Sequence, residues 1–530
     1  MLLYHAISTY QILNCIVHRQ VYNANEKSIL LLPDFIVNKF PSYRDLETFE
    51  LFDEIYLLPY DVQYEIGKIE GQIAVRYEST VPYKISDFRK IYVAGVHFPF
   101  TIYLLENKVP FHYFEDASGL MSHPEVVRNT MIDRFPAHVA VADYYNLFHP
   151  NGDLVLSRIC KASAQDPNYK DSKMVDFDVV KEFSNLPLEK QNNVKRFFHC
   201  PDQLELPKKS ALVLTQHLAN LGVLDFTDQI LLYQLFVDYF LKDYQLVFKP
   251  HPDDPIYYSL LFPAAHVIRE KFPSEFLPYI FKNKPEVIAT VSSTAINNLT
   301  DSFEKTLKLD IPFERHFKHI HKFFISLKCF EDLFSQITLY AETKQKYLFE
   351  NLLLYTLTSK NKFSMSDDPT ISNAIIFDME DICDVAYSDQ IIHLLDSLND
   401  SQIACFFNCT NDYGFYNLQR KDLWDHIVPV VIKKQVWPGE DYYSDSDDEL
   451  LYFYVKNPEM RKMIEQFSTE KELNHAGVKL SVTPLSKEEQ RILVLEGILK
   501  ATEKRLIHYI KREEELLEYI DQHNFKEHEK

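Results

Sequence analysis

Short, nearly continuous apolar runs alternate along the chain with longer stretches in which apolar residues recur at helical spacing. A short continuous apolar run is typical of a strand that is buried on both faces. Strands and helices that alternate in this way predict parallel sheets covered by helices on both sides. The expected strands of the first series are 2–8, 28–35, 54–60, 90–97 and 110–116.

A second and a third series follow a polar, lysine-rich stretch at 161–209, which reads as a linker. The second has expected strands at 210–216, 244–250 and 285–293, with helices at 226–241 and near 273–282. The third has strands at 373–379, 402–408 and 429–435. The pattern therefore predicts an α/β protein with two α/β domains, at 1–195 and 205–365. An additional α/β region at 370–485 and a long C-terminal helix at 486–530 follow them.

The last helix has apolar residues at heptad positions, which is typical of a coiled coil. Three alternatives stay open for it: dimerisation, packing on its own protein, or contact between its basic side and an anionic membrane surface. The heptad series comprises Ile492, Leu495, Leu499, Thr502, Leu506, Tyr509, Leu516 and Ile520. A strongly acidic segment at 440–449 precedes this helix and reads as a solvated loop or an interaction site.

Composition narrows the class of protein. The 530 residues include 56 lysines and arginines and 77 aspartates and glutamates, which gives a formal net charge of −21. A nucleic-acid partner is therefore not expected, because nucleic-acid binding needs a basic surface. The seven cysteines form no CxxC pair, which favours a reducing compartment over a disulfide framework. Neither a signal peptide nor a membrane-spanning apolar run is found, so we expect a cytoplasmic protein, with peripheral contact at the inner face of the membrane left open.

Three polar clusters come directly after expected strands: FEDASG at 114–119, KPHP at 249–252 and VSSTA at 291–295. In open α/β sheets ligands bind at the carboxyl ends of the strands, so the shared position of these clusters matters more than any one of them.

In KPHP, Pro250 and Pro252 hold the backbone extended and end the strand, so His251 is aimed by a stiff main chain. An imidazole there can donate a hydrogen bond to a phosphate oxygen. Lys249 adds positive charge, although alternation along the strand directs it to the opposite face. A structural histidine is the alternative.

The other two clusters offer a base and an anion site. Adjacent residues of a strand face opposite ways, so only one of Glu115 and Asp116 is expected to enter the crevice, where it could take a proton from a hydroxyl. Ser292, Ser293 and Thr294 open a helix and could hold a phosphate. The alternative for the first cluster is an ordinary acidic strand end that is followed by a turn at Ser118 and Gly119. The alternative for the second is that Ser293 only caps the helix.

These motifs, in this order, resemble those of the bacterial sialyltransferases of glycosyltransferase family 52 and the related polysialyltransferases, over roughly residues 1–300. Glu115-Asp116-Ala117 stands at the family's acidic motif, His251-Pro252 at its HP motif and Ser292-Ser293 at its serine pair. YHAISTYQILNCI resembles the family's first strand and helix, LTQHL (214–218) its first nucleotide-domain strand, and FPSEFLPYI (272–280) a later segment. Ala117 departs from the family's glycine.

The resemblance implies a GT-B fold, in which two Rossmann-like domains face each other across a cleft. It implies inverting transfer of sialic acid, or a similar nonulosonic acid, from a CMP-activated donor to a glycan hydroxyl, without a metal or other cofactor. The product would be a cell-surface polysaccharide such as capsule or lipooligosaccharide, and the acceptor could be lipid-linked. Asp116 would be the general base, and His251 would be the general acid or a hydrogen-bond donor to the leaving nucleotide phosphate. The nucleotide would be held by Lys249, Pro252, Ser292, Ser293, Thr294, Thr215, Gln216 and Glu275, with Glu115, Ser118 and Gly119 in support.

Three other interpretations remain. The donor could carry a Kdo-like sugar or a polyol phosphate. The acidic strand end IIFDMEDI (375–382), with Asp378, Glu380 and Asp381, could mark a second, metal-binding module rather than a plain strand end. Ala117 alone favours a non-catalytic, transferase-like scaffold that binds partners.

Overall fold

The structure is a computed structural model of the chain. It describes residues 1–201, 203–207, 209–309, 313–314, 317–341, 363–378, 385–407, 422, 425–435, 449–470, 472–475 and 478–484, with scattered residues between 486 and 517. The chain divides into two compact units. Unit 1 contains Met1–Phe226 and Asp243–Lys308, and unit 2 contains Thr227–Lys242 and Leu309–Lys530.

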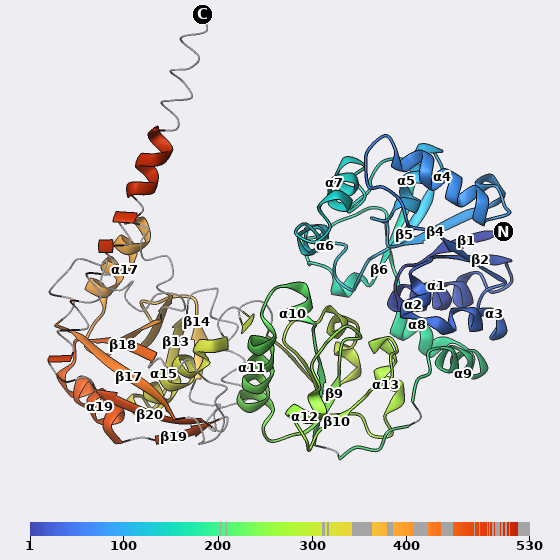
Figure 1. Cartoon of the computed structure of the whole chain (residues 1–530). Coiled ribbons are helices and arrows are strands. Elements are labelled where there is room, and N and C mark those ends of the chain that lie inside the picture. Colours follow the sequence, from blue (N-terminus) through green and yellow to red (C-terminus); the bar gives the residue numbers. More distant parts are fainter. Residues whose placement is uncertain are drawn as a thin grey trace, which may run out of the picture. The chain divides into compact units, whose positions relative to one another are not determined.

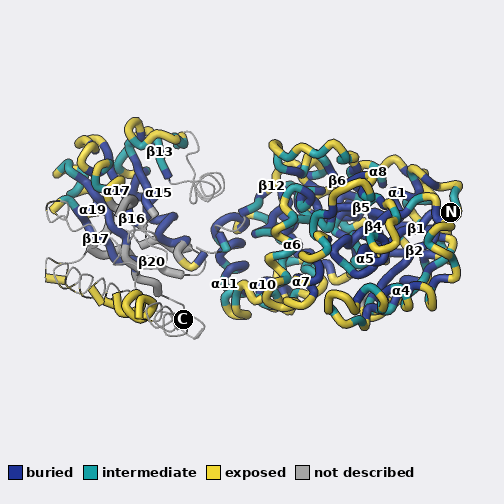
Figure 2. The backbone as a smooth tube through the Cα atoms, turned by 90° about the horizontal axis from the view of Figure 1, so that it is seen from above, coloured by how far each residue is buried: buried dark blue, intermediate teal, exposed yellow. Residues whose placement is uncertain are grey.

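The first sheet of unit 1 has seven parallel strands in the order β3-β2-β1-β4-β5-β6-β7. The strand order reverses between β1 and β4, as in Rossmann-like sheets. Every residue of β1 and β2 is buried, which explains why these strands read as continuous apolar runs (Figure 2). The strands are β1 (Leu2–His5), β2 (Ser28–Pro33), β3 (Glu54–Leu58), β4 (Lys90–Ala94), β5 (Phe111–Phe114), β6 (Val155–Cys160) and β7 (Met174–Asp176).

Helices connect these strands and cover the sheet (Figure 1). The first is capped by Ser8, whose hydroxyl accepts from the backbone N–H of Gln11. The helices are α1 (Thr9–Tyr22), α2 (Ile36–Lys39), α3 (Asp45–Thr48), α4 (Ile69–Thr80), α5 (Pro99–Glu106), α6 (Pro124–Met131) and α7 (Pro136–Tyr144).

The second sheet of unit 1 has five parallel strands in the order β10-β9-β8-β11-β12. Its order reverses between β8 and β11, so this domain is Rossmann-like as well. Its strands are β8 (Ser210–Leu214), β9 (Gln245–Lys249), β10 (His266–Val267), β11 (Val287–Thr290) and β12 (Lys305–Lys308), and its helices are α10 (Leu218–Leu221), α12 (Tyr258–Leu261) and α13 (Leu277–Ile280).

Residues 161–209, expected as a linker, are largely folded, and this corrects the sequence-based interpretation. They contain β7, α8 (Val179–Asn185) and α9 (Leu188–Phe197). Asp178 caps α8 by accepting from the N–H groups of Val180 and Lys181. Phe183 on this helix packs edge-on against Phe276 of the second domain, with ring centroids 5.1 Å apart. One apolar core therefore runs through both domains of unit 1.

Unit 2 is built on an eight-stranded mixed sheet in the order β14-β13-β15-β16-β18-β17-β20-β19. The first four strands in this order are parallel, and the others join antiparallel. Its strands are β13 (Ile337–Ala341), β14 (Phe363–Ser366), β15 (Ala374–Asp378), β16 (Ile403–Phe407), β17 (Ile427–Gln435), β18 (Glu449–Val455), β19 (Glu472–His475) and β20 (Val478–Pro484), and its helices include α11 (Phe226–Phe236), α15 (Ile320–Leu333), α17 (Val385–Ser397) and α19 (Pro458–Glu470).

The predicted fold class is confirmed. Two Rossmann-like domains of the GT-B type are followed by an additional C-terminal α/β region. The expected boundary at 365 needs correction, because the second sheet ends with β12 and both β13 and β14 pair within the third sheet. Residues 227–242, expected in the second domain, belong to unit 2 instead. Phe236 and Phe240 of this segment pack on Phe313 of the same unit.

Among the described residues, no helix combines the length and the apolar character that a membrane crossing requires. The described residues between 488 and 517 are helical. The heptad residues of this helix that the structure describes are exposed, and they include Ile492, Leu495, Leu499, Leu506, Tyr509 and Leu516. Dimerisation and membrane contact through this helix stay predictions. Most of the acidic segment at 440–449, and Glu380 and Asp381 of the alternative metal site, lie outside the described residues.

Candidate active site

Asp116 follows β5 and is held by the first turn of α1. The side-chain amide of Gln11 donates from Nε2 to Oδ1 of Asp116 at 2.7 Å. The backbone N–H of Ile7 donates to Oε1 of Gln11 at 2.9 Å, which fixes the orientation of this amide. Burial raises the pKa of Asp116 to about 6, and the bond from Gln11 opposes that rise. A carboxylate with such a pKa can accept a proton near neutral pH.

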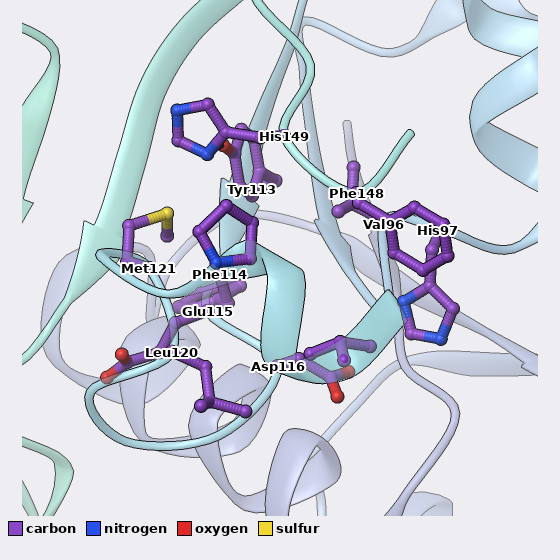
Figure 3. A pocket seen from close by; sticks show the side chains of 12 residues that line it. Val96, His97, Tyr113, Phe114, Glu115, Asp116, Leu120, Met121, Phe148 and His149 are labelled. Atoms are coloured by element: carbon purple, nitrogen blue, oxygen red, sulfur yellow. Dashed lines mark hydrogen bonds between the residues drawn. The ribbon is translucent and has the colours of Figure 1, made fainter. Parts of the chain in front are cut away.

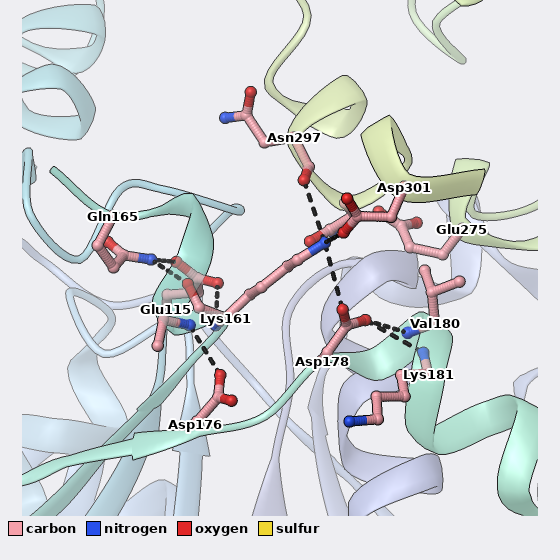
Figure 4. A network of polar contacts seen from close by, with 12 residues as sticks. Glu115, Lys161, Gln165, Asp176, Asp178, Val180, Lys181, Glu275, Asn297 and Asp301 are labelled. Carbon is pink, nitrogen blue, oxygen red and sulfur yellow. Dashed lines mark hydrogen bonds and ion pairs between the residues drawn. The ribbon is translucent and has the colours of Figure 1, made fainter. Parts of the chain in front are cut away.

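Glu115 has other hydrogen-bond partners than Asp116, but both residues line the same pocket after the end of β5. The expectation that only one of the two carboxylates enters the crevice therefore needs correction. Glu115 is 4% exposed and accepts hydrogen bonds from the backbone N–H of Lys161 at 3.1 Å and from Nε2 of Gln165 at 2.9 Å (Figure 4). The backbone N–H of Gly119 also donates to it, at 2.9 Å. Burial raises its pKa to about 7, and the hydrogen bonds oppose the rise. Glu115 thus organises the loop that carries Asp116.

The alanine at the family's glycine position does not strain the loop. Ala117 is not among the residues with positive φ, whereas Gly119 has a φ of +89°. A Cβ on Gly119 would lie 2.9 Å from the backbone oxygen of Ala164 and 3.2 Å from Nδ2 of Asn297. The glycine that this loop requires is therefore Gly119.

His251 sits at the start of a β-turn that follows β9. The backbone N–H of Asp254 donates to the carbonyl of His251 at 3.0 Å, with Pro252 at the position where its fixed φ suits a turn. The backbone N–H of Asp253 donates to Nδ1 of the His251 imidazole at 3.2 Å. A neutral imidazole that accepts at Nδ1 carries its proton on Nε2, so it is a hydrogen-bond donor there.

Thr215 is buried and anchors this turn. Its hydroxyl accepts from the backbone N–H of His251 at 3.2 Å and donates to Oδ2 of Asp254 at 2.5 Å. The hydroxyl of Tyr258 donates to the same carboxylate oxygen at 2.8 Å. Thr215, which was expected to bind the nucleotide, therefore also holds the turn of His251 in place. The neighbouring Gln216 is half-buried and follows β8.

His217 was missed by the sequence analysis, although it follows Gln216 in the LTQHL stretch. Its ring stacks on that of His251, with centroids 3.9 Å apart and planes 20° from parallel. His217, His251 and Asp253 hold nitrogen and oxygen atoms within 4.8 Å of one another. Nearly parallel stacked rings do not direct two lone pairs at one ion, and Nδ1 of His251 already accepts a bond, so the geometry suits hydrogen-bond donation better than joint metal ligation.

Ser292 and Ser293 follow β11 and precede a short helix, as expected, which is the 3₁₀ helix Thr294–Asn298. Ser293 does not cap this helix, because its side chain makes no capping hydrogen bond. Instead its backbone N–H donates to the hydroxyl of Thr290 at 3.0 Å. The helix has fewer than two turns, so the side-chain hydroxyls of Ser292, Ser293 and Thr294 matter more here than a helix dipole.

Lys249 and Glu275 lie within the protein. Lys249 is 5% exposed, its Nζ donates to the carbonyl of Glu270 at 3.2 Å, and it lies over the ring of Phe272. Burial lowers its pKa to about 8. Glu275 accepts from Nδ2 of Asn298 at 2.9 Å, and burial raises its pKa.

Polar contacts join the first domain to the segment after the serine pair, and Figure 4 shows those of Lys161. Nδ2 of Asn297 donates to the carbonyl of Ser118 at 3.1 Å. The ammonium of Lys161, itself 5% exposed, pairs with Asp178 at 3.2 Å and reaches Asp301 and the carbonyl of Asn297, both at 3.4 Å. The loop of the first domain that carries Asp116 is thus in direct contact with the 3₁₀ helix of the second domain that follows Ser292 and Ser293.

No protein-family model matches the chain, and no curated protein matches it. Solved structures similar to it include an α/β-galactoside α-2,3-sialyltransferase from the luminous marine bacterium Photobacterium phosphoreum, at 12% identity over 58% of this chain and 90% of that one, with a TM-score of 0.34. A UDP-GlcNAc 2-epimerase from Methanocaldococcus jannaschii matches at 16% identity over 58% and 88%, with a TM-score of 0.35. At these TM-scores the likenesses carry no argument about the activity of this chain.

Proposed function

We propose that the protein is an inverting, metal-independent glycosyltransferase that moves a sialic acid, or a similar nonulosonic acid, from a CMP-activated donor to a glycan hydroxyl. The bond from Asn297 to the carbonyl of Ser118 carries the proposal, because it joins the loop of Asp116 to the 3₁₀ helix that follows the serine pair. It supports a shared site that combines a carboxylate, an imidazole donor and a pair of serine hydroxyls. The motif resemblance supplies the donor class.

Asp116 acts as the base. Its carboxylate takes the proton of the acceptor hydroxyl while the acceptor oxygen forms a bond to the anomeric carbon. The bond from that carbon to the phosphate oxygen breaks, and the electron pair leaves with CMP. The raised pKa of Asp116 supports this role, because a weakly acidic carboxyl is a better proton acceptor than an ordinary one.

His251 stabilises the leaving phosphate. The backbone bond to Nδ1 supports a proton on Nε2, from which the ring donates to the phosphate oxygen as negative charge develops. Ser292 and Ser293, with Thr294, supply further donors from the adjacent loop. Thr215 and Asp254 keep the turn of His251 in place.

The test is a thermal-shift panel of CMP, CDP, UDP, GDP and ADP, each with and without Mg²⁺, followed by assays with CMP-sialic acid. A ligand at about a hundred times its dissociation constant raises the stability by roughly 2.7 kcal/mol. Stabilisation by CMP that is indifferent to magnesium, with release of CMP from the donor, is the expected result. Stabilisation by UDP or GDP alone would discard the donor class. A transferred Kdo-like sugar or polyol phosphate would favour the alternative donor. No response to any nucleotide would favour the non-catalytic scaffold.

A further inference from the structure

The carboxylate of Asp116 is held by few direct contacts. Among the described residues, Gln11 alone donates a hydrogen bond to it. Asp116 also lines a mostly apolar pocket that has room for little more than a water molecule (Figure 3). The position of this carboxylate is therefore set by what holds Gln11 and by what holds the loop that follows Asp116.

The loop is held from the second domain by Asn297. The side-chain amide of Asn297 donates to the carbonyl of Ser118, two residues after Asp116, at 3.1 Å. The backbone of Asn297 is fixed in turn, because its carbonyl accepts from the buried ammonium of Lys161 at 3.4 Å (Figure 4). The segment after the serine pair thus holds the loop of Asp116 at a backbone atom.

Asn298, the next residue, holds the helix that carries Gln11. Its Nδ2 donates to the hydroxyl of Tyr10 at 3.3 Å and to Oε1 of Glu275 at 2.9 Å. An amide nitrogen carries two hydrogens, so both bonds can form at once. Tyr10 directly precedes Gln11 in the first turn of α1. Asn298 is 3% exposed, so a partner lost from its amide would not be replaced by bulk water.

Consecutive residues of the second domain therefore reach both supports of the base. We propose that Asn297 and Asn298 are positioning residues, which align the carboxylate of Asp116 with the serine pair. They act through the loop at Ser118 and through Tyr10 of α1, not on the reacting atoms. The inference rests on the proposed function and adds that the segment after the phosphate-binding hydroxyls also sets the base in place.

The test uses two variants that each remove one of these bonds. Asn297→Leu keeps the size of the side chain but removes the donor to Ser118, and Tyr10→Phe removes the hydroxyl that accepts from Asn298. The measured quantity is kcat for release of CMP from CMP-sialic acid, with lactose and with water as the acceptor. Because a small misplacement of a reacting group slows a reaction strongly, kcat should fall at least about tenfold in Asn297→Leu and at least about threefold in Tyr10→Phe. The affinity for CMP should stay unchanged in both, because neither bond involves the serine hydroxyls.

Tyr279→Phe is the matched control. The hydroxyl of Tyr279 on α13 of the second domain donates to the carbonyl of Val180 on α8 at 2.7 Å. The control therefore removes a hydrogen bond between the same two parts of unit 1 by the same chemical change as Tyr10→Phe, but it leaves both supports of Asp116 in place. Its kcat and its affinity for CMP should equal those of the unaltered protein.

An equal fall of kcat in Tyr279→Phe would show that these bonds only hold the domains together, and would overturn the inference. A loss of CMP affinity that matches the fall of kcat would also overturn it, because the asparagines would then serve the nucleotide. Unchanged kcat in both variants would do the same, and Tyr10→Phe alone decides if Asn297→Leu does not fold. Absence of CMP release by the unaltered protein would instead overturn the proposed function, and the inference with it.

Discussion

Gln11 donates a hydrogen bond from Nε2 to Oδ1 of Asp116 at 2.7 Å, and this bond joins the first turn of α1 to the end of β5. The two residues are far apart in sequence: Gln11 lies in the helix that follows β1, and Asp116 follows β5, from which β1 is separated by β4 alone. The bond favours the ionised carboxylate and burial opposes it, and the balance leaves the pKa of Asp116 at about 6.

The role of this carboxylate predicts the effect of Asp116→Asn. The amide keeps the shape of the side chain but cannot accept the acceptor's proton, so transfer should fall by about 10²- to 10⁴-fold. Nucleotide binding should stay near that of the unaltered protein. Turnover and CMP binding measured on the same preparation check the prediction, and a variant that keeps most of its activity would show that another group is the base.

The pH dependence of kcat/KM follows from the same pKa. The folded-state pKa of Asp116 is raised, so the base is ionised above about pH 6 and protonated below it. The rate should therefore fall as pH decreases through about 6. Gln11→Met removes the donor that favours ionisation and should move this limb to higher pH, whereas Gln191→Met on α9 should leave it in place. Identical profiles for all three proteins would contradict the assignment.

The fold was largely predictable, because strands buried on both faces have a recognisable composition. β1, β2, β8 and β11 all lie within expected apolar runs. The linker prediction for residues 161–209 was wrong because α9 is amphipathic and mostly polar, and its buried contacts through Phe197 become visible only once the sheet is in place. The domain boundary predicted at 365 was wrong because the sequence pattern does not reveal that β13 pairs with β15 of the third sheet.

The candidate site was predictable as a set of strand ends, but not in its supporting contacts. Asp116, His251 and the serine pair were expected at such ends, and the structure has them there. Gln11 and His217 act through long-range contacts that no local spacing encodes. Ala117 matters less than the family pattern suggests, because the need for glycine arises at position 119, from Ala164 on another loop.

The turn at His251 predicts a further kinetic effect. His251→Ala removes a donor to the leaving phosphate, so both CMP affinity and turnover should fall, turnover by about 10²- to 10³-fold. Tyr257→Ala, on a residue that is 76% exposed close to the same turn, serves as the control and should change neither. Normal CMP affinity in His251→Ala would show that this ring does not contact the phosphate.

Thr215→Val tests whether the Thr215 hydroxyl is structural. The change removes the hydroxyl that links the backbone of His251 to Asp254 and leaves buried polar groups unsatisfied. The free energy of unfolding without nucleotide should fall by about 1–3 kcal/mol. Denaturant unfolding of the ligand-free protein measures it, and a loss confined to nucleotide affinity would mean that the hydroxyl serves the ligand instead.

Gly119→Ala should destabilise unit 1 for two separable reasons. The backbone at Gly119 has a φ of +89°, and the added Cβ would meet the carbonyl oxygen of Ala164 at 2.9 Å. Gly152→Ala is a matched control, because Gly152 has a φ of +92° and a Cβ added there would meet nothing within 4 Å. The control should lose about 1 kcal/mol from the backbone conformation alone. Gly119→Ala should lose more and should also slow transfer, because the clash displaces the loop of Asp116. Equal losses in denaturant unfolding would show that this loop yields without cost, and unchanged transfer would show that its position does not matter for the reaction.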